Sequence, residues 1–148
     1  MLEKLFYEKG LHFACQRCSS CCRHDPGFVF LSEKDVDILV DALKMRYNDF
    51  IETYCRWIRA GDGIEKLSLK EQSNYDCIFW KNGCILYEAR PLQCRTFPFW
   101  RSMVRSKAAW DGSKEYCPGM DRGPLHSRDE IEARLTQRDN EPIIERKT

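Results

Sequence analysis

The sequence predicts an α+β fold. The chain has 148 residues, which is enough for one domain with a hydrophobic core. Segments with helical periodicity alternate with short strand-like segments, and cysteine-bearing loops lie between them. We therefore expect a single small domain over residues 1–148. It should contain two to four helices, a short β-hairpin or sheet, and a frayed tail over about residues 140–148.

Composition and charge exclude several classes of protein. Apolar residues make up 43% of the chain and charged residues 32%, which is typical of a folded soluble protein. The net charge of +1 gives no strong field for attracting nucleic acid or anionic lipid. No apolar run is long enough to span a membrane, and the charges at Glu3, Lys4, Glu8 and Lys9 do not fit a secretory signal. We expect a cytoplasmic protein with neither a nucleic-acid nor a membrane partner.

The clearest helix lies over residues 32–45. Ser32 is placed as its N-cap, Asp35 stands at the capping-box position, and apolar side chains follow at helical spacing. A second helix is predicted from Asn48, with Ile58 still on its apolar face and Gly61 at its end. Residues 67–70 and 75–80 read as strands.

The second half of the chain is more irregular. Asn82-Gly83 predicts a hairpin, which would place the nearby cysteines on or beside paired strands. Residues 88–100 contain two prolines and fit a turn or one helical turn, residues 101–110 read as a strand, and residues 117–124 read as a loop. A final helix is predicted over residues 127–140, with Ser127 as cap and Glu130 as its capping-box partner.

Nine cysteines dominate the composition, and their odd number argues against a pure disulfide framework. In a reducing cytoplasm such a density indicates metal or redox chemistry. Cys21 and Cys22 are adjacent, and a disulfide between neighbours is strained because their Cα atoms lie only about 3.8 Å apart. The cysteine-bearing loops hold little regular structure, so we expect the metal to organise the fold.

Spacing favours an iron–sulfur cluster slightly over zinc. Three cysteines in a C-x2-C-x2-C run, with a remote cysteine followed by proline, are typical of a 4Fe-4S cluster, and Cys117-Pro118 is such a partner. Zinc remains an alternative, because eight thiolates could also form two closed tetrahedral sites. In extended backbone Cys21 and Cys22 would point to opposite sides, so that they serve two metals, or one binds a metal while the other packs or bridges. Two sites are favoured because Cys77, Cys84 and Cys94 supply enough further thiols.

Three arginines stand close to cysteines in the sequence. Four thiolates around zinc or an oxidised cubane cluster leave a charge of about −2, which requires nearby donors and cations. Arg23 follows Cys22, Arg95 follows Cys94, and Arg90 precedes Cys94 by four residues. We expect Arg23, Arg90 and Arg95 to surround the ligands and support them.

The segments "CQRCSSCC", "CIFWKNGCILYEARPLQCRTFPF" and "CPG" resemble the YkgJ-like cysteine-cluster family, whose members are described as zinc- or iron-chelating domains with a CxxCxxCC signature. These motifs extend from residue 15 to residue 119. The family pattern commonly has Gly after the second cysteine, where this chain has Ser19. Similar motifs occur in flagellin lysine methylases, which are iron–sulfur-dependent.

The resemblance implies eight metal ligands: Cys15, Cys18, Cys21, Cys22, Cys77, Cys84, Cys94 and Cys117. It also implies a supporting motif made of Tyr87, Arg90, Pro91, Arg95, Phe97 and Pro98. Cys55 lies outside the motifs on an apolar stripe, so it is expected in the core. His12 and His24 are expected beside the ligands or at the surface, and His126 carries no functional signal.

The leading function is therefore a cytoplasmic cysteine-cluster protein that chelates a 4Fe-4S cluster or zinc. A redox role, or an accessory role in a modification reaction such as methylation, would go with a cluster. The alternative is a purely structural zinc module that presents a surface to a protein partner. The sequence leaves open whether the protein is an enzyme, what its substrate would be, and its oligomeric state.

Overall fold

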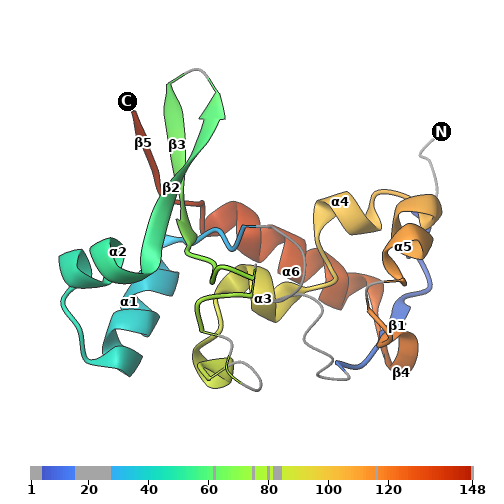
Figure 1. The fold of residues 1–148 in the computed structure, drawn as a ribbon. Coiled ribbons are helices and arrows are strands. Elements are labelled where there is room, and N and C mark those ends of the chain that lie inside the picture. Colours follow the sequence, from blue (N-terminus) through green and yellow to red (C-terminus); the bar gives the residue numbers. More distant parts are fainter. Residues whose placement is uncertain are drawn as a thin grey trace. The chain divides into compact units, whose positions relative to one another are not determined.

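The computed structural model describes residues 5–15, 28–61, 63–74, 76–79, 81, 85–115 and 117–147, and their fold is α+β (Figure 1). The elements, in chain order, are β1 (Leu11–Phe13), α1 (Glu33–Leu43), α2 (Tyr47–Tyr54), β2 (Cys55–Gly61), β3 (Ile64–Leu69), the 3₁₀ turn η1 (Tyr87–Ala89), α3 (Leu92–Thr96), α4 (Arg101–Val104), α5 (Lys107–Ser113), β4 (Met120–His126), α6 (Arg128–Asn140) and β5 (Glu145–Lys147). The predicted fold class is confirmed, with more helices than the two to four expected.

The chain divides into two compact units, each built from two stretches of sequence. Unit 1 comprises Met1–Cys21 and Thr96–Asn140, and unit 2 comprises Cys22–Arg95 and Glu141–Thr148. Each unit has its own small sheet: β1 pairs with β4 in unit 1, and unit 2 holds a three-stranded sheet in the order β2-β3-β5. No helix in the described part of the chain is long and apolar enough to cross a membrane.

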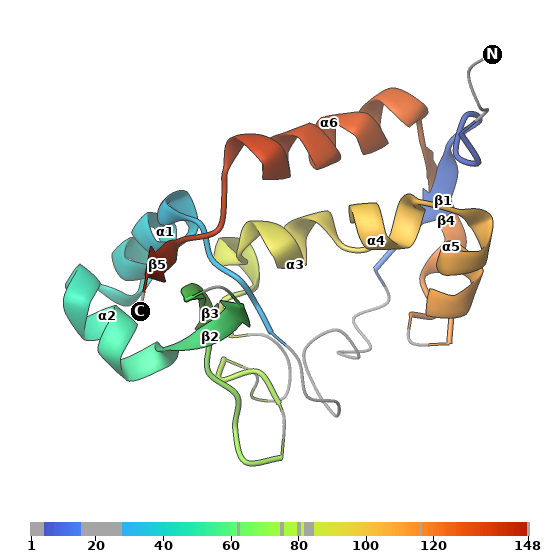
Figure 2. The ribbon, with the colours of Figure 1, turned by 90° about the horizontal axis from the view of Figure 1, so that it is seen from above.

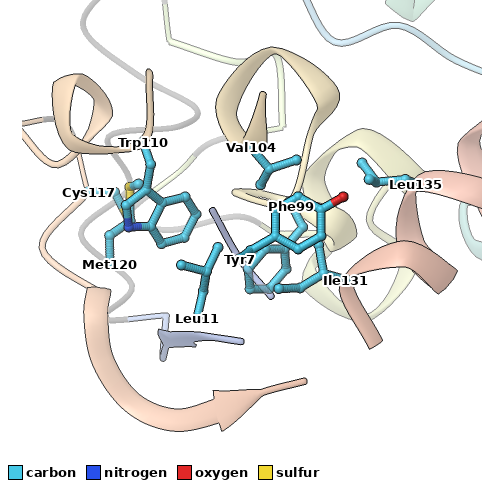
Figure 3. Packing of buried hydrophobic residues seen from close by; sticks show 9 residues of the cluster. All are labelled: Tyr7, Leu11, Phe99, Val104, Trp110, Cys117, Met120, Ile131 and Leu135. Atoms are coloured by element: carbon cyan, nitrogen blue, oxygen red, sulfur yellow. The ribbon is translucent and has the colours of Figure 1, made fainter. Parts of the chain in front are cut away.

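Unit 1 has a core of aromatic and aliphatic side chains in which one predicted ligand takes part (Figure 3). Its buried members are Tyr7, Leu11, Phe99, Val104, Trp110, Cys117, Met120, Ile131 and Leu135. The rings of Phe99 and Trp110 stack at 5.9 Å between centroids. Helix α6 contributes Ile131 and Leu135 from one face, because these two residues are four positions apart.

Two segments of unit 1 differ from the sequence predictions. Residues 101–110 were predicted as a strand, but they form α4 and the start of α5. The Ser106 hydroxyl accepts a hydrogen bond from the Ala109 backbone N–H and caps α5, a local signal that the strand interpretation overlooked. Residues 117–124 were predicted as a loop, but β4 begins at Met120 because it pairs with β1.

The predicted caps of α1 and α6 are present. In α1 the Ser32 hydroxyl accepts from the Asp35 N–H at 3.1 Å, and the Asp35 carboxylate accepts from the Ser32 N–H at 3.0 Å. In α6 the Ser127 hydroxyl accepts from the Glu130 N–H at 3.2 Å. Both helices therefore begin where their side chains can satisfy backbone N–H groups.

The second predicted helix is too long. Helix α2 ends at Tyr54, and residues 55–61 form β2, which pairs antiparallel with β3 from Cys55↔Leu69 to Gly61↔Ile64. Gly61 and Gly63 adopt φ angles of 92° and 72°, which suits the reversal between the two strands. The apolar spacing of residues 55–61 fits a helix, but it does not reveal that β3 is available as a partner. The hydrogen bonds to β3 decide for a strand. Helices α1 and α2 lie side by side in this unit (Figure 2).

The last described residues, where we expected a frayed tail, form β5. Its register with β3 runs from Ile64↔Lys147 to Lys66↔Glu145, so the C-terminal segment forms an edge of the unit 2 sheet. Ile144 precedes it, donating its N–H to the Leu31 carbonyl and accepting from the Leu67 N–H.

Of residues 75–80, which we predicted as a strand, the structure describes residues 76–79, and these are largely irregular. Cys77 forms one isolated bridge with Glu71, and Ile78 and Phe79 lie in a turn. The Asn82-Gly83 hairpin signal lies outside the described residues. The predicted helical turn within residues 88–100 is present as η1 and α3.

Candidate metal centre

Four of the eight predicted ligands are described by the structure: Cys15, Cys77, Cys94 and Cys117. The others, Cys18, Cys21, Cys22 and Cys84, lie outside the described residues, as do Arg23 and His24. Among the described residues, no group of three or more His, Cys, Asp or Glu side chains is placed to hold a metal ion. The positions of the four described cysteines in the fold therefore indicate whether they could take part in a metal site.

Cys15 and Cys117 lie at the same end of the β1–β4 ladder. The register pairs Phe13 with Met120, and the Ala14 N–H extends the pairing by donating to the Gly119 carbonyl at 3.2 Å. Cys15 is the next residue along one side of the ladder, and Cys117 lies two residues before Gly119 on the other. Antiparallel pairing thus places two cysteines that are far apart in the sequence at the same end of one ladder.

The turn that carries Cys117 is compact. The Met120 N–H donates to the Cys117 carbonyl at 3.3 Å, which closes a β-turn with Pro118 and Gly119 at its centre. A Cβ atom on Gly119 would lie 2.1 Å from the Ala14 carbonyl oxygen, closer than any real contact allows. The glycine of the CPG motif is therefore required for the close approach of the two strands.

Hydrogen bonds and an ion pair connect the residues just after this turn to α5 and its C-cap. The Asp121 carboxylate accepts from the Trp110 indole N–H at 2.9 Å and forms an ion pair with Lys114. Burial acts to raise the pKa of Asp121, but the hydrogen bonds from Lys114 and Trp110 outweigh it and hold the pKa below its ordinary value. The Cys117 N–H also donates to the Lys114 carbonyl at 3.2 Å, so α5 supports the cysteine directly.

The two cysteines differ in environment. Cys117 is buried in the unit 1 core beside Trp110 and Met120 (Figure 3), whereas Cys15 is exposed. Thiolates are soft ligands that suit zinc and iron–sulfur iron. One buried and one exposed cysteine at the same end of the ladder are compatible with a metal at the edge of the core, to which the flanking cysteine run would add further ligands.

In unit 2, Cys77 is half-buried and packs against the core around Leu69 and Phe79. Its carbonyl accepts a hydrogen bond from the Gln72 side chain at 3.0 Å, and the following Ile78 N–H donates to the Lys70 carbonyl. These bonds hold the backbone of Cys77 beside the end of β3.

Cys94 is also half-buried and sits in α3, flanked by two of the predicted arginines. The Arg90 guanidinium stacks on the Tyr87 ring at 3.8 Å and donates to the Tyr87 carbonyl at 2.9 Å. The Arg95 Nε donates to the Arg90 carbonyl at 3.0 Å, which links η1 to α3. These arginines thus hydrogen-bond to the backbone of the segment that precedes Cys94. That they also support the metal ligands stays a prediction.

Sequence reasoning did not connect Asp35 or Gln93 with Cys94. The Asp35 carboxylate accepts from the Leu92 N–H, and the Gln93 side chain bonds the backbone of Phe28 and Phe30. Asp35 was identified only as a local helix cap, and nothing in the pattern singled out Gln93. Both contacts depend on partners more than fifty residues away in sequence.

Cys55 and the described histidines have roles within the fold. Cys55 is buried in the unit 2 core, as predicted. His12 is exposed, with its Nδ1 2.9 Å from the Gly123 carbonyl oxygen. His126, which carried no sequence signal, lies with its Nε2 3.0 Å from the Phe13 carbonyl oxygen and so links the two sides of the β1–β4 ladder.

Comparison with known proteins places these features in a family. The chain is 26% identical over 131 residues to "Uncharacterized protein MJ0939" and 28% identical over 96 residues to "Uncharacterized protein MJ0661", both from Methanocaldococcus jannaschii. The matches cover 81% and 63% of this chain but only 41% and 48% of those relatives, so the chain spans less than half of their length. No solved structure matches it.

A family model matches residues 14–118, which contain all eight predicted ligands and most of the supporting segments described above. The model is that of the CxxCxxCC family, described as a "Putative zinc- or iron-chelating domain". The resemblance that the cysteine motifs indicated is thus confirmed over most of the chain. This protein belongs to the CxxCxxCC family of zinc- or iron-chelating domains.

Proposed function

We propose that this protein is a cytoplasmic metalloprotein that chelates a 4Fe-4S cluster or zinc through eight cysteines: Cys15, Cys18, Cys21, Cys22, Cys77, Cys84, Cys94 and Cys117. The two units would form one domain organised by the bound metal. A cluster would supply one-electron redox chemistry, and zinc would supply a closed structural site. The cysteine ligands would hold either metal as thiolates.

The observation that carries this proposal is that Cys15 and Cys117 both lie at one end of the β1–β4 ladder. Cys15 opens the C-x2-C-x2-C run, and Cys117 is the remote cysteine followed by proline. A cubane cluster is held by four cysteine thiolates, and three close cysteines with one distant cysteine are a typical arrangement for it. We propose that Cys15, Cys18, Cys21 and Cys117 form one ligand group and that the other four cysteines form a second.

The identity of the metal is tested by purifying the protein without oxygen. A cluster predicts brown protein with sulfide-to-iron charge-transfer absorption and with iron and acid-labile sulfide in equal amounts. Loss of the colour on reduction with dithionite and its return on oxidation would support a redox role. Colourless protein with two zinc ions per chain would contradict the cluster and leave zinc chelation standing.

The ligand assignment has a matched control inside the chain. Cys18→Ala should lose metal, whereas Cys55→Ala should keep the full metal content, because Cys55 belongs to the core of unit 2. Equal loss of metal from both variants would overturn the division of the cysteines into ligands and core residues.

One observation favours the second candidate, a structural zinc module that serves a protein partner. Cys117 is only 7% exposed and packs within the unit 1 core, as a ligand does when metal and core stabilise each other. Cobalt substitution distinguishes the candidates: a closed four-thiolate site should not change its absorption when cyanide or imidazole is added. A spectral change would indicate an open coordination position and favour a reactive centre.

A further inference from the structure

We propose that Asp35 and Gln93 are positioning residues that hold Cys94 in place for metal binding; this inference rests on the proposed function. Cys94 lies in α3, a helix of only five residues, which is too short to be stable by itself. Its position must therefore come from contacts outside the helix. The residues on both sides of Cys94 make those contacts to the segment of residues 28–35, hereafter the anchor segment.

Gln93 binds the anchor segment with both ends of its side-chain amide. Its Oε1 accepts the Phe30 N–H at 3.0 Å, and its Nε2 donates to the Phe28 carbonyl at 2.7 Å. The amide thus pairs with the Phe30 N–H and the Phe28 carbonyl, which are two residues apart. The backbone of a neighbouring strand would pair with the same two groups. This pair of bonds fixes both the distance and the orientation of α3 relative to the anchor segment.

Asp35 makes the second attachment. Its side chain is fully buried, with 0% exposure, and one oxygen accepts the Leu92 N–H at 2.9 Å. That N–H belongs to the first residue of α3 and has no partner within the helix. Asp35 therefore caps α3 from a distance while its other oxygen completes the capping box of α1.

Arg95 adds charge to the same contact. Its Nη2 lies 4.0 Å from the Asp35 carboxylate oxygen that binds Leu92. Residues 92, 93 and 95 are thus all attached to the anchor segment, and the side chain between them is that of Cys94. A shift of the Cys94 backbone would break at least one of these contacts, and a buried carboxylate that loses its donors is costly.

The anchor segment begins close to the cysteine run. Phe28 follows Cys22 by six residues, and a chain of that length spans at most about 20 Å. The Gln93 bonds consequently limit how far Cys94 can lie from the end of the run. Metal ligands are commonly held by such outer contacts, and the loss of one typically lowers metal affinity about 10–100-fold.

The test uses Co²⁺ alone as the probe, because its thiolate charge-transfer absorption reports how many cysteines bind it. Gln93→Ala and Asp35→Asn should each reduce this absorption as Cys94→Ser does and should weaken Co²⁺ binding about 10-fold or more. Ser127→Ala is the control: it removes a helix-cap hydrogen bond in unit 1 and should leave the absorption unchanged. Circular dichroism checks that each variant is folded.

A double-mutant cycle separates positioning from general destabilisation. In the Cys94→Ser background, Gln93→Ala should have no further effect on Co²⁺ binding, because the ligand that it positions is already absent. An equal loss in both backgrounds would overturn the inference, as would a Gln93→Ala variant with the absorption and affinity of the unmodified chain. If Asp35→Asn does not fold, Gln93→Ala decides alone, since its side chain is only half-buried.

The outcomes also distinguish this inference from the proposed function. Absence of cobalt–thiolate absorption from the unmodified chain would contradict binding of a divalent metal by the thiolates, and the inference with it, whereas iron and sulfide analysis decides separately whether a cluster is bound. Strong absorption that is lost in Cys94→Ser but kept in Gln93→Ala and Asp35→Asn would leave chelation standing and overturn only the positioning role.

Discussion

Cys55 is a core residue with a strongly perturbed thiol. It is 6% exposed among the apolar side chains of unit 2, and burial raises the pKa of its thiol to about 12. The thiol therefore stays protonated at neutral pH, although Lys70 acts to lower the pKa slightly. A protonated buried thiol is a poor nucleophile and a poor metal ligand, which is consistent with its place outside the family motifs.

This perturbed thiol predicts a pH dependence of stability. In the unfolded chain Cys55 would ionise near its ordinary pKa of 9.0, whereas in the folded chain it keeps its proton up to about pH 12. Ionisation thus favours the unfolded chain as the pH rises above 9, and folding stability falls by up to about 1.4 kcal/mol per pH unit in that range. Cys55→Ala should lack this contribution.

The measurement is urea unfolding of the metal-free chain and of the Cys55→Ala variant. The wild-type chain should be the more stable at about pH 8, and its advantage should shrink at about pH 11 because only its unfolded state gains from ionisation of Cys55. The other cysteines are the same in both chains, so their contributions cancel in the difference. A stability difference that does not change with pH would contradict the buried protonated thiol.

Gly119 permits the close approach of the two chain segments that carry Cys15 and Cys117. Gly119→Ala should destabilise unit 1 by about 1–3 kcal/mol, because its Cβ would collide with the Ala14 carbonyl. The displaced ladder should also lower metal content. Thermal unfolding and metal analysis measure the two effects.

The control for this substitution is Gly112→Ala. Gly112 lies in α5, and a Cβ atom there would meet nothing within 4 Å. Alanine in a helix is favoured over glycine by about 0.5–1 kcal/mol, so this variant should be neutral or slightly more stable. If Gly119→Ala behaved like Gly112→Ala, the close approach would not be important for the site.

Among the elements, the caps of α1 and α6 were predictable and several strands were not. Ser32 and Ser127 act on N–H groups three residues away, so the information lies within a single turn. Strand β2 was read as helix because Ile51, Tyr54, Cys55 and Ile58 also fit a helical spacing, and only its pairing with β3 shows otherwise. The predictions from residue spacing were wrong mainly for short elements whose partners are distant in the sequence.

Strand β5 is held by side chains as well as by its ladder. The Arg146 guanidinium lies 4.1 Å from the Trp57 ring centroid, and its Nε donates to Glu65 at 3.2 Å. Arg146→Ala should release β5 at a cost of about 0.5–1 kcal/mol and increase amide hydrogen exchange at residues 145–147. Arg146→Lys keeps the charge but not the planar stacking, so its amide hydrogen exchange should lie between that of the unmodified chain and that of Arg146→Ala. Unchanged exchange in Arg146→Ala would mean that the ladder alone holds the strand.

For the whole molecule, the proposed metal should couple the cysteine-bearing segments to the fold. Removing it with a chelator in the absence of oxygen should lower the melting temperature, because a ligand that binds only the folded chain stabilises it. The expected change is about 3 °C for each kcal/mol of binding free energy lost. Restoring the metal should restore the melting temperature, and a melting temperature that does not respond to the metal would contradict a metal-organised fold.

The sequence alone determined the family, the α+β class, the two capped helices and the identity of the candidate ligands, since each depends on residue type and local spacing. Only the tertiary structure placed Cys15 beside the Cys117 turn and attached the residues around Cys94 to the anchor segment. The tertiary structure also shows that residues 55–61 and 145–147 are strands, because both pair with β3. The physical reason is the same in each case. A strand or a short helix such as α3 is completed by hydrogen bonds to partners far along the chain, which local periodicity does not encode.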